Sequence, residues 1–303
     1  MHRPSLARPA LAAVVAIALL AACRIEDDAS FRRASASRVT AMTPSGLATS
    51  SDDPAVEAEV PTGPAGDAIR RGRAILLATR DSLPANVGNG LRCVSCHLDE
   101  GRRPHAMPWT GVYARFPQYR SRSDRVERLE DRVNDCFLRS LAGRPLPAES
   151  PAMRDIVAYM AHLSRGVPVG VGVPGQGVDT VRITERGDPV AGQGVFVAQC
   201  ARCHGPNGEG TKLATPLWGP RSFTIGAGMA RWRVAASFIR HNMPNDRPET
   251  LTDAEAVDVA AYVTGQRRPD FAGKERDWPR GNAPPDAAYK TVAAKSRRSA
   301  AGS

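Results

Sequence analysis

Four stretches of the chain carry apolar residues at helical spacing, and they form two pairs. The first pair consists of residues 67–79 and a stretch that begins at Ser150, directly before a proline. The second pair consists of residues 191–198 and a stretch that begins at Thr252, three residues before Glu255. Serine before proline and threonine three residues before glutamate are typical of helix N-termini. The pattern predicts a mainly α-helical protein with two small domains, each having an opening and a closing helix.

The segments around these stretches lack apolar periodicity. Residues 23–65 are rich in Ala, Ser, Thr, Asp and Pro, a composition typical of a flexible tether. We predict an N-terminal domain at 66–168, a glycine-rich linker at 169–187 and a C-terminal domain at 188–270. The remaining residues, 271–303, end in a basic run and are predicted to be a disordered tail.

Residues 1–22 have the features of a secretory signal peptide. Two arginines precede an apolar run from Leu11 to Ala22, which is too short to span a bilayer. The run ends in Leu-Ala-Ala before Cys23, which resembles the lipobox of bacterial lipoproteins. We therefore expect an exported, periplasmic protein, attached to a membrane only through lipid on Cys23. The alternative is an ordinary signal peptide with a cysteine near its cleavage site.

The strongest chemical signal is a motif that occurs twice: two cysteines separated by two residues and followed by histidine. The copies are Cys93-Val94-Ser95-Cys96-His97 and Cys200-Ala201-Arg202-Cys203-His204. In c-type haem attachment the thiols bond to the porphyrin and the histidine becomes the proximal iron ligand. One copy alone could be half of a zinc site, but two copies predict two haems. Each copy follows an opening helix, so we expect two tandem class I cytochrome c-type domains, each with a covalently bound haem.

The remaining cysteine, Cys136, has no thiol partner. Of six cysteines, four belong to the two motifs and Cys23 is assigned to lipid. A buried core cysteine is the simplest explanation. However, the surrounding sequence is rich in charge, and a thiolate is a strong iron ligand. We therefore favour Cys136 as the distal ligand of the first haem, with His105 and Met107 as rivals. Two methionines in the closing helix have the spacing of core residues instead.

The distal ligand of the second haem is expected between the two helices of its domain. Met243, directly before a proline, has the loop position from which cytochrome c methionines reach iron. Met229, Lys212 and His241 are the alternatives. A thioether ligand raises the reduction potential of a haem. We therefore expect the second haem to receive electrons.

The charge of the chain favours small anions as ligands. The formal net charge is +10 and the isoelectric point is about 9.8. Nucleic acid is not expected as a partner, because a good part of the excess charge lies at the end of the tail. The rest suits small anions or an acidic redox partner. Aromatic residues make up only 5% of the chain, so a buried haem would supply apolar bulk that each small domain lacks.

Three further stretches resemble the dihaem thiosulfate dehydrogenase family. They are Val87 to Arg92 before the first motif, Ala114 to Tyr119, and Leu129 to Arg132 leading to Cys136. The resemblance covers most of residues 66–268.

This resemblance implies the roles of the site residues. The first haem would be catalytic, with His97 and Cys136 as axial ligands, and the second would be an electron-exit haem ligated by His204 and Met243. The family's substrate-site residues fall on Arg122, Arg132 and Ser140. Certain relatives have a lysine beside the methionine that competes for iron. This chain has Asn242 there, so a redox-linked change of ligand is not expected.

The family reaction joins two thiosulfates into tetrathionate and releases two electrons, in some members in the reverse direction. The resemblance thus implies thiosulfate and tetrathionate as ligands, and we expect a small periplasmic cytochrome as electron acceptor. Two dianions repel each other by about 4 kcal/mol at roughly 4 Å in water, and more strongly in a cleft of lower dielectric. Fixed arginines suit this task because a planar guanidinium grips sulfonate oxygens at two points.

Three other functions account for parts of the sequence. A non-catalytic dihaem electron carrier explains both motifs but gives Cys136 no role. A sulfur-transfer enzyme with a cysteine-ligated haem would bind a carrier protein in place of a free anion. A dihaem peroxidase needs an open or displaceable position at one iron and has no special use for Cys136.

Overall fold

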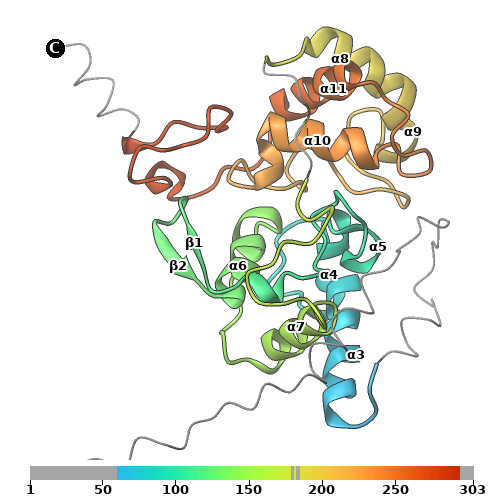
Figure 1. The fold of residues 1–303 in the computed structure, drawn as a ribbon. Helices are drawn as coiled ribbons and strands as arrows, with labels where there is room; N and C mark the ends of the chain where they lie inside the picture. Colours follow the sequence, from blue (N-terminus) through green and yellow to red (C-terminus); the bar gives the residue numbers. More distant parts are fainter. Residues whose placement is uncertain (1–59, 179–180, 182–184, 294–303) are drawn as a thin grey trace, which may run out of the picture. The chain divides into compact units, whose positions relative to one another are not determined.

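The computed structural model describes residues 60–178, 181 and 185–293 (Figure 1). The predicted signal peptide, Cys23, most of the tether and the last ten residues of the tail lie outside these ranges. Helices and loops make up nearly all of the described residues. The helices are α3 (Pro64–Leu77), α4 (Thr79–Ser82), α5 (Leu98–Gly101), α6 (Leu129–Asp135), α7 (Pro151–His162), α8 (Pro189–Val195), α9 (Ala201–His204), α10 (Trp232–Asn242) and α11 (Asp253–Gly265).

The opening and closing helices of the first half pack directly on each other. Helix α3 begins at Pro64, earlier than predicted, because proline is favoured in the first helical turn. The predicted start of α7 is confirmed, since the Ser150 hydroxyl accepts a hydrogen bond from the Met153 amide. At the crossing, a Cβ on Gly72 would lie 1.9 Å from the Asp155 carbonyl oxygen, so the two backbones touch. The core between them includes Met153 and Met160, as predicted from their spacing.

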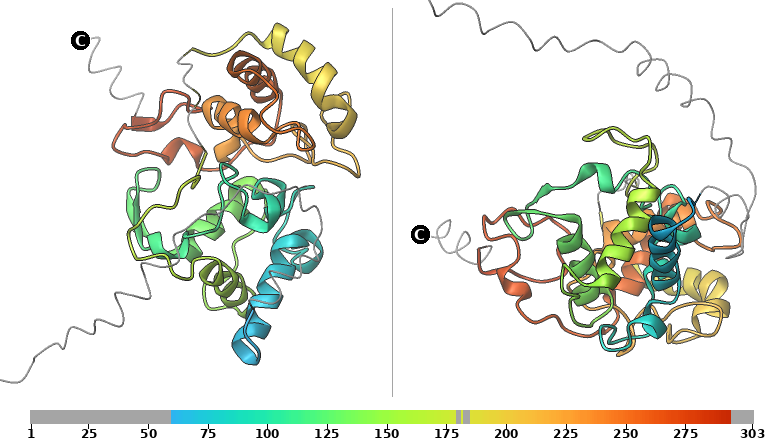
Figure 2. Two further views of the ribbon diagram at one scale, coloured as in Figure 1. Left: turned by 45° about the vertical axis from the view of Figure 1, so that its right-hand side comes forward. Right: turned by 90° about the horizontal axis from the view of Figure 1, so that it is seen from below.

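The second half repeats this arrangement with α8 and α11 (Figure 2). Helix α8 begins after Asp188, whose carboxylate accepts from the Val190 amide. The predicted capping box of Thr252 and Glu255 is confirmed at the start of α11. Here too a glycine allows the crossing, because a Cβ on Gly192 would lie 2.0 Å from the Asp258 carbonyl oxygen. Both haem motifs therefore lie beside a tightly packed helix pair.

Two π-helical turns and a hairpin are not predicted from the sequence. The π turns are Cys136–Ser140, directly after α6, and Phe196–Cys200, directly after α8. The hairpin pairs strand β1 (Gln118–Arg120) antiparallel with β2 (Arg125–Glu127), with Arg120 opposite Arg125. The described residues contain no other sheet. Strands of three residues are too short to give a readable alternation.

The prediction of a disordered tail is wrong for residues 271–293, which we call the C-terminal segment. This segment contains a 3₁₀ turn at Lys274–Arg276. Trp278 is only 3% exposed, and Asp277 and Asp286 are also buried. A buried tryptophan and two arginine-bound carboxylates outweigh the polar composition from which disorder was predicted.

None of the helices in the described ranges has the length and apolar character needed to cross a bilayer.

Candidate functional site

The first haem motif is anchored to the opening helix by Thr79. The Thr79 hydroxyl donates to the Leu76 carbonyl (3.0 Å) and accepts from the Cys93 amide (3.1 Å). The motif begins as a 3₁₀ turn, Cys93–Ser95, in which the Ser95 hydroxyl accepts from the Arg92 amide. Both thiols are thus held on a fixed turn. None of the cysteines in the described ranges forms a disulfide, so all four motif thiols are free to bond to porphyrin.

Both motif histidines have the hydrogen bond expected of a proximal iron ligand. Nδ1 of His97 lies 2.6 Å from the Met107 carbonyl oxygen, and Nδ1 of His204 lies 2.8 Å from the Thr215 carbonyl oxygen. A carbonyl only accepts, so each Nδ1 carries the proton and each Nε2 keeps a lone pair for a metal. Burial lowers the pKa of His97 to about 4 and also lowers the pKa of His204. Both imidazoles are therefore neutral, the form that binds iron.

The alternative that each motif is half of a zinc site is not supported by the described residues. Throughout residues 60–178, 181 and 185–293, no group of three or more His, Cys, Asp or Glu side chains could hold a metal ion. A structural zinc site needs four such ligands. The two motifs therefore fit covalently attached haem.

The two rival ligands of the first haem, His105 and Met107, each make a contact with a histidine. The Met107 carbonyl oxygen lies 2.6 Å from the His97 Nδ1, so the Met107 backbone lies beside the proposed proximal ligand. The His105 ring stacks on the His241 ring, with centroids 4.8 Å apart. His241 in turn lies 3.4 Å from a carboxylate oxygen of Glu249. His105 and His241 therefore contact each other through their rings.

Cys136 lies beside the first motif and is bound by an arginine. It is the first residue of the π turn after α6, and Arg132 lies one helical turn before it. The Arg132 Nη1 is 3.4 Å from the Cys136 Sγ. The charge of Cys136 is the largest cause that raises the pKa of Arg132. Burial, and secondly the charge of Cys136, raises the pKa of Cys96 to about 12, so Cys136 lies close to the motif.

The structure places the other two predicted substrate residues near this turn without joining them to Cys136. Arg122 lies in the turn between β1 and β2, where its Nη1 donates to the Gly226 carbonyl (2.8 Å). Ser140 ends the π turn, and its carbonyl accepts from the Asn89 amide group (2.8 Å). Cys136, Arg132 and Ser140 are therefore held on one continuous helical segment, while Arg122 reaches the site from the hairpin.

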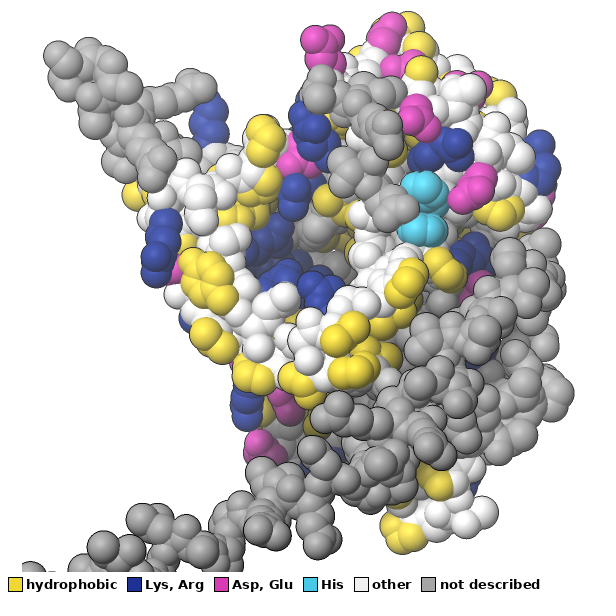
Figure 3. All heavy atoms as spheres, in the orientation of Figure 1, with side chains coloured by type: hydrophobic (Ala, Val, Ile, Leu, Met, Phe, Trp, Pro, Cys, Tyr) yellow, Lys and Arg dark blue, Asp and Glu magenta, His cyan; other side chains and the backbone are white. Residues whose placement is uncertain are grey.

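Basic side chains gather in a hollow over α6 and beside the hairpin (Figure 3). Burial lowers the pKa of Arg120, and the charge of Arg132 lowers it further. Burial likewise lowers the pKa of Arg122, and the charge of Arg139 lowers it further. Four arginines thus lie within electrostatic reach of one another. Such a cluster is stable when anions neutralise it.

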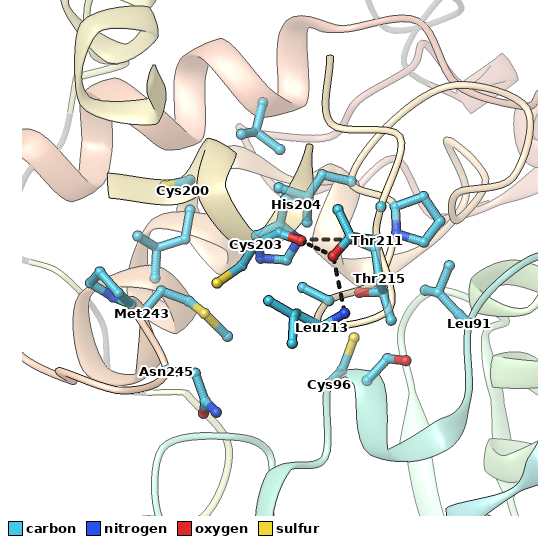
Figure 4. Close-up of a pocket in the computed structure, with 18 of the residues that line it drawn as sticks. Leu91, Cys96, Cys200, Cys203, His204, Thr211, Leu213, Thr215, Met243 and Asn245 are labelled. Atoms are coloured by element: carbon cyan, nitrogen blue, oxygen red, sulfur yellow. Dashed lines mark hydrogen bonds between the residues drawn. The ribbon is translucent and has the colours of Figure 1, made fainter. Parts of the chain in front are cut away.

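A cavity of about 730 Å³ adjoins the second motif (Figure 4). This is within the range of roughly 300–1,000 Å³ typical of ligand and cofactor sites. His204 and Met243 point into it from α9 and from the end of α10, while Met229 and Lys212 also line it. Apolar side chains of α10 and α11 complete the wall, among them Phe238, Ile239, Val259 and Val263. The residues fit a haem whose proximal ligand is His204.

The same cavity is lined by Val94 and Cys96 of the first motif and by Leu98, which follows the motif. Figure 4 shows the Cys96 sulfur directed toward it, across from Cys203 and Leu213. A porphyrin attached at Cys96 and another attached at Cys203 would therefore lie close together. This suits electron transfer between two haems of one chain.

Sequence reasoning missed two groups of residues at this site. Arg120 faces inward from β1, and its Nη1 donates to the Gln118 carboxamide (3.0 Å). Asp277 and Trp278 of the C-terminal segment contact Arg139 and Arg122. Their partners lie more than a hundred residues away in the sequence, so no local pattern could reveal them.

Comparison with known protein families agrees with this architecture. Residues 85–169 match the model described as SoxA/TsdA, cytochrome c domain. Residues 187–263 match the model described as cytochrome C oxidase, cbb3-type, subunit III. The fold is therefore two tandem cytochrome c domains with two c-type haems, as predicted.

The chain is similar to several thiosulfate dehydrogenases. It is 46% identical to the thiosulfate dehydrogenase of Allochromatium vinosum over 222 residues, 70% of this chain and 82% of that protein. It is 41% identical to the thiosulfate dehydrogenase of Psychrobacter arcticus over 254 residues, 80% of this chain and 78% of that protein. The solved structure of thiosulfate dehydrogenase (TsdBA) from Marichromatium purpuratum matches with a TM-score of 0.69 and 33% identity, covering 75% of this chain and 52% of that one. The chain belongs to the thiosulfate dehydrogenase family of c-type cytochromes.

Proposed function

We propose that this protein oxidises two thiosulfates to tetrathionate at the first haem, with His97 and Cys136 as axial ligands. Two electrons leave through the second haem, ligated by His204 and Met243, to an external cytochrome. The observation that carries the proposal is the contact between Arg132 and Cys136, 3.4 Å long, beside the first motif. The guanidinium is partly buried, and its positive charge lies against the sulfur that would bind iron and attack substrate as a thiolate.

The basic hollow accounts for binding of the substrates. Two thiosulfates carry four negative charges, and their mutual repulsion grows as water is excluded. Arg132 offers guanidinium donors beside the reacting sulfur, and Arg122 offers donors from the hairpin turn. Ser140 adds a hydroxyl donor from the end of the π turn. These groups orient the two anions so that their sulfane sulfurs meet near Cys136.

A covalent route balances atoms and charge. Cys136 would first give up its place as axial ligand; its thiolate then bonds to the sulfane sulfur of one thiosulfate, and two electrons leave. The second thiosulfate then attacks that sulfur, which forms tetrathionate and releases the Cys136 thiolate. The haems supply one-electron acceptance, one electron each. No proton is transferred in either step, so permanently charged arginines suffice and no general base is needed.

The cavity shared by Cys96 and Cys203 accounts for the exit of electrons. A thioether ligand from Met243 would raise the potential of the second haem above that of a thiolate-ligated one. Electrons would then run from the first haem to the second. The loop around the second motif, which includes Lys212 and Leu213, is exposed and offers a place for a small cytochrome acceptor.

Export fits this chemistry, because cytochrome c domains of this kind are typically periplasmic. We propose that residues 1–22 are a signal peptide of the lipoprotein type and that lipid on Cys23 attaches the mature protein to a membrane. Mass spectrometry of the mature N-terminus tests this.

The function is tested by thiosulfate-dependent reduction of an artificial electron acceptor by the protein loaded with both haems. Cys136→Ala is measured in parallel. We expect the wild type to turn over, and the variant to keep two covalent haems while losing at least about a hundredfold in kcat. The variant should also lose the absorption and EPR signals of a thiolate-ligated haem. If neither protein oxidises thiosulfate or reduces tetrathionate, the chain is a non-catalytic electron carrier.

A further inference from the structure

We propose that the C-terminal segment is part of the substrate site, and that Asp277 is a positioning residue which holds Arg122 and the Cys136 turn in place. This inference rests on the proposed function, since it assigns Arg122 and Cys136 the roles given above. The segment lies outside both matched cytochrome domains, which end at residues 169 and 263. Asp277 and Trp278 nevertheless contact Arg139 and Arg122 of the catalytic half.

Asp277 binds the turn that carries Cys136. Its two carboxylate oxygens accept from Arg139 Nη1 (2.8 Å) and Nη2 (2.9 Å), a bidentate pair across 138 sequence positions. Arg139 lies three residues after Cys136, within the π turn Cys136–Ser140. The ion pair is buried, with the Asp277 side chain 8% exposed and that of Arg139 12% exposed. Bidentate pairs fix orientation as well as distance.

Two further contacts complete the hold on this turn. The Arg139 guanidinium lies over the Phe271 ring, 4.3 Å from its centroid. The Arg139 carbonyl accepts from the Thr224 hydroxyl (2.9 Å). The C-terminal segment therefore binds the side chain of Arg139, and Thr224 binds its backbone carbonyl.

The same segment holds Arg122. The Trp278 amide donates to the Arg122 carbonyl (2.8 Å), and the Arg122 guanidinium lies 4.7 Å from the centroid of the Trp278 ring. The Asp277 carboxylate lies 3.8 Å from the Arg122 Nε. One face and one edge of the guanidinium are thus occupied. The donors that remain are left to orient an anion.

Asp277 also allows two cations to lie close together. The pKa of Arg122 is lowered by burial, and the charge of Arg139 lowers it further, while Asp277 opposes this effect. Tyr289 donates to the same carboxylate and so helps to fix it. Without the Asp277 charge, the two guanidiniums would repel each other. Arg122 would then leave the Trp278 ring and the Gly226 carbonyl.

The test is Asp277→Asn in the protein loaded with both haems. We expect the KM for thiosulfate to rise by about tenfold or more, because the amide accepts hydrogen bonds but carries no charge. We expect kcat to change less than threefold, since Cys136 and Arg132 remain. Asp277→Glu, which restores the charge, should return KM at least partly toward the wild-type value. The dissociation constant of thiosulfate, measured by calorimetry, should follow KM.

Asp286→Asn is the matched control. Asp286 also lies in the C-terminal segment and also binds an arginine, with 2.8 Å between its Oδ1 and Arg231 Nη2, but it holds neither Arg122 nor Arg139 in this way. We expect its KM to match the wild type. An unchanged or lowered KM in Asp277→Asn, whether or not the melting temperature falls, would show that Asp277 is merely structural. A wild type that binds thiosulfate without turnover contradicts the proposed function alone. A wild type that does not bind thiosulfate overturns this inference as well.

Discussion

Arg120 is a cation of the basic hollow that forms no ion pair with a carboxylate among the described residues. It lies on the same face of β1 as Gln118, and that neutral side chain is the hydrogen-bond partner of its guanidinium. Arg122 and Arg139, in contrast, share Asp277. Two thiosulfates bring four negative charges. Arg120 is therefore placed to neutralise charge on the second thiosulfate.

Arg120→Gln should therefore raise the KM for thiosulfate by about tenfold, the effect of one lost charged hydrogen bond. Arg125→Gln is the control, because Arg125 lies opposite Arg120 in the ladder but its side chain is 65% exposed. Steady-state kinetics of both variants decide the matter. Equal KM values in the two variants would show that Arg120 does not bind thiosulfate.

The sequence predicts the residues that act through a fixed spacing and not those that act through the fold. The two motifs are recognisable from their spacing and Cys136 from the count of cysteines, while Arg132 is implied by the family resemblance. Arg120 and Asp277 are not predicted, since their roles depend on a hairpin and on a contact made across 138 positions. A basic composition near the chain end also concealed the buried part of the C-terminal segment.

Among the elements, the crossing of α8 and α11 depends on a glycine. A Cβ on Gly192 would lie 2.0 Å from the Asp258 carbonyl oxygen, whereas nothing lies within 4 Å of a Cβ on Gly194 in the same helix. Such a clash forces the helices apart, and alanine's better helix propensity cannot offset it.

Gly192→Ala should lower the free energy of unfolding by about 1–3 kcal/mol. Gly194→Ala should instead raise it by roughly 0.5–1 kcal/mol, because alanine replaces glycine in an exposed helical position. Thermal unfolding of the haem-loaded proteins measures both. A stabilised Gly192→Ala variant would mean that the helix crossing is looser than described.

The two helix starts that were predicted from capping residues are confirmed, whereas the π turns are not predicted. Ser150 and Thr252 cap α7 and α11 as expected, because their hydroxyls bind amides only a few residues away. Helices α6 and α8 instead pass into π turns at Cys136 and Phe196. The extra residue in such a turn is favoured by packing around a functional site, and local propensity does not reveal it.

For the molecule as a whole, the order of the two haem potentials decides the direction of electron flow. Met243 and Met229 both line the cavity of the second haem, so the sequence and the cavity leave two methionines to compare. Met243 follows α10 directly, and Figure 4 shows its side chain directed into the cavity.

Met243→His should lower the reduction potential of the second haem by something on the order of 0.1 V, because imidazole favours ferric iron more than a thioether does. Met229→His should leave that potential nearly unchanged. A spectroscopic redox titration of each variant gives the values. The reverse result would make Met229 the ligand.

The hydrogen bonds of His97 and His204 have a practical consequence for such titrations. Each imidazole donates from Nδ1 to a backbone carbonyl, at 2.6 Å and 2.8 Å. Since both histidines make the same kind of hydrogen bond, that bond contributes similarly to the potentials of both haems. The voltage difference between the two waves of a single titration then reports mainly how the distal sides differ, without a second protein for comparison.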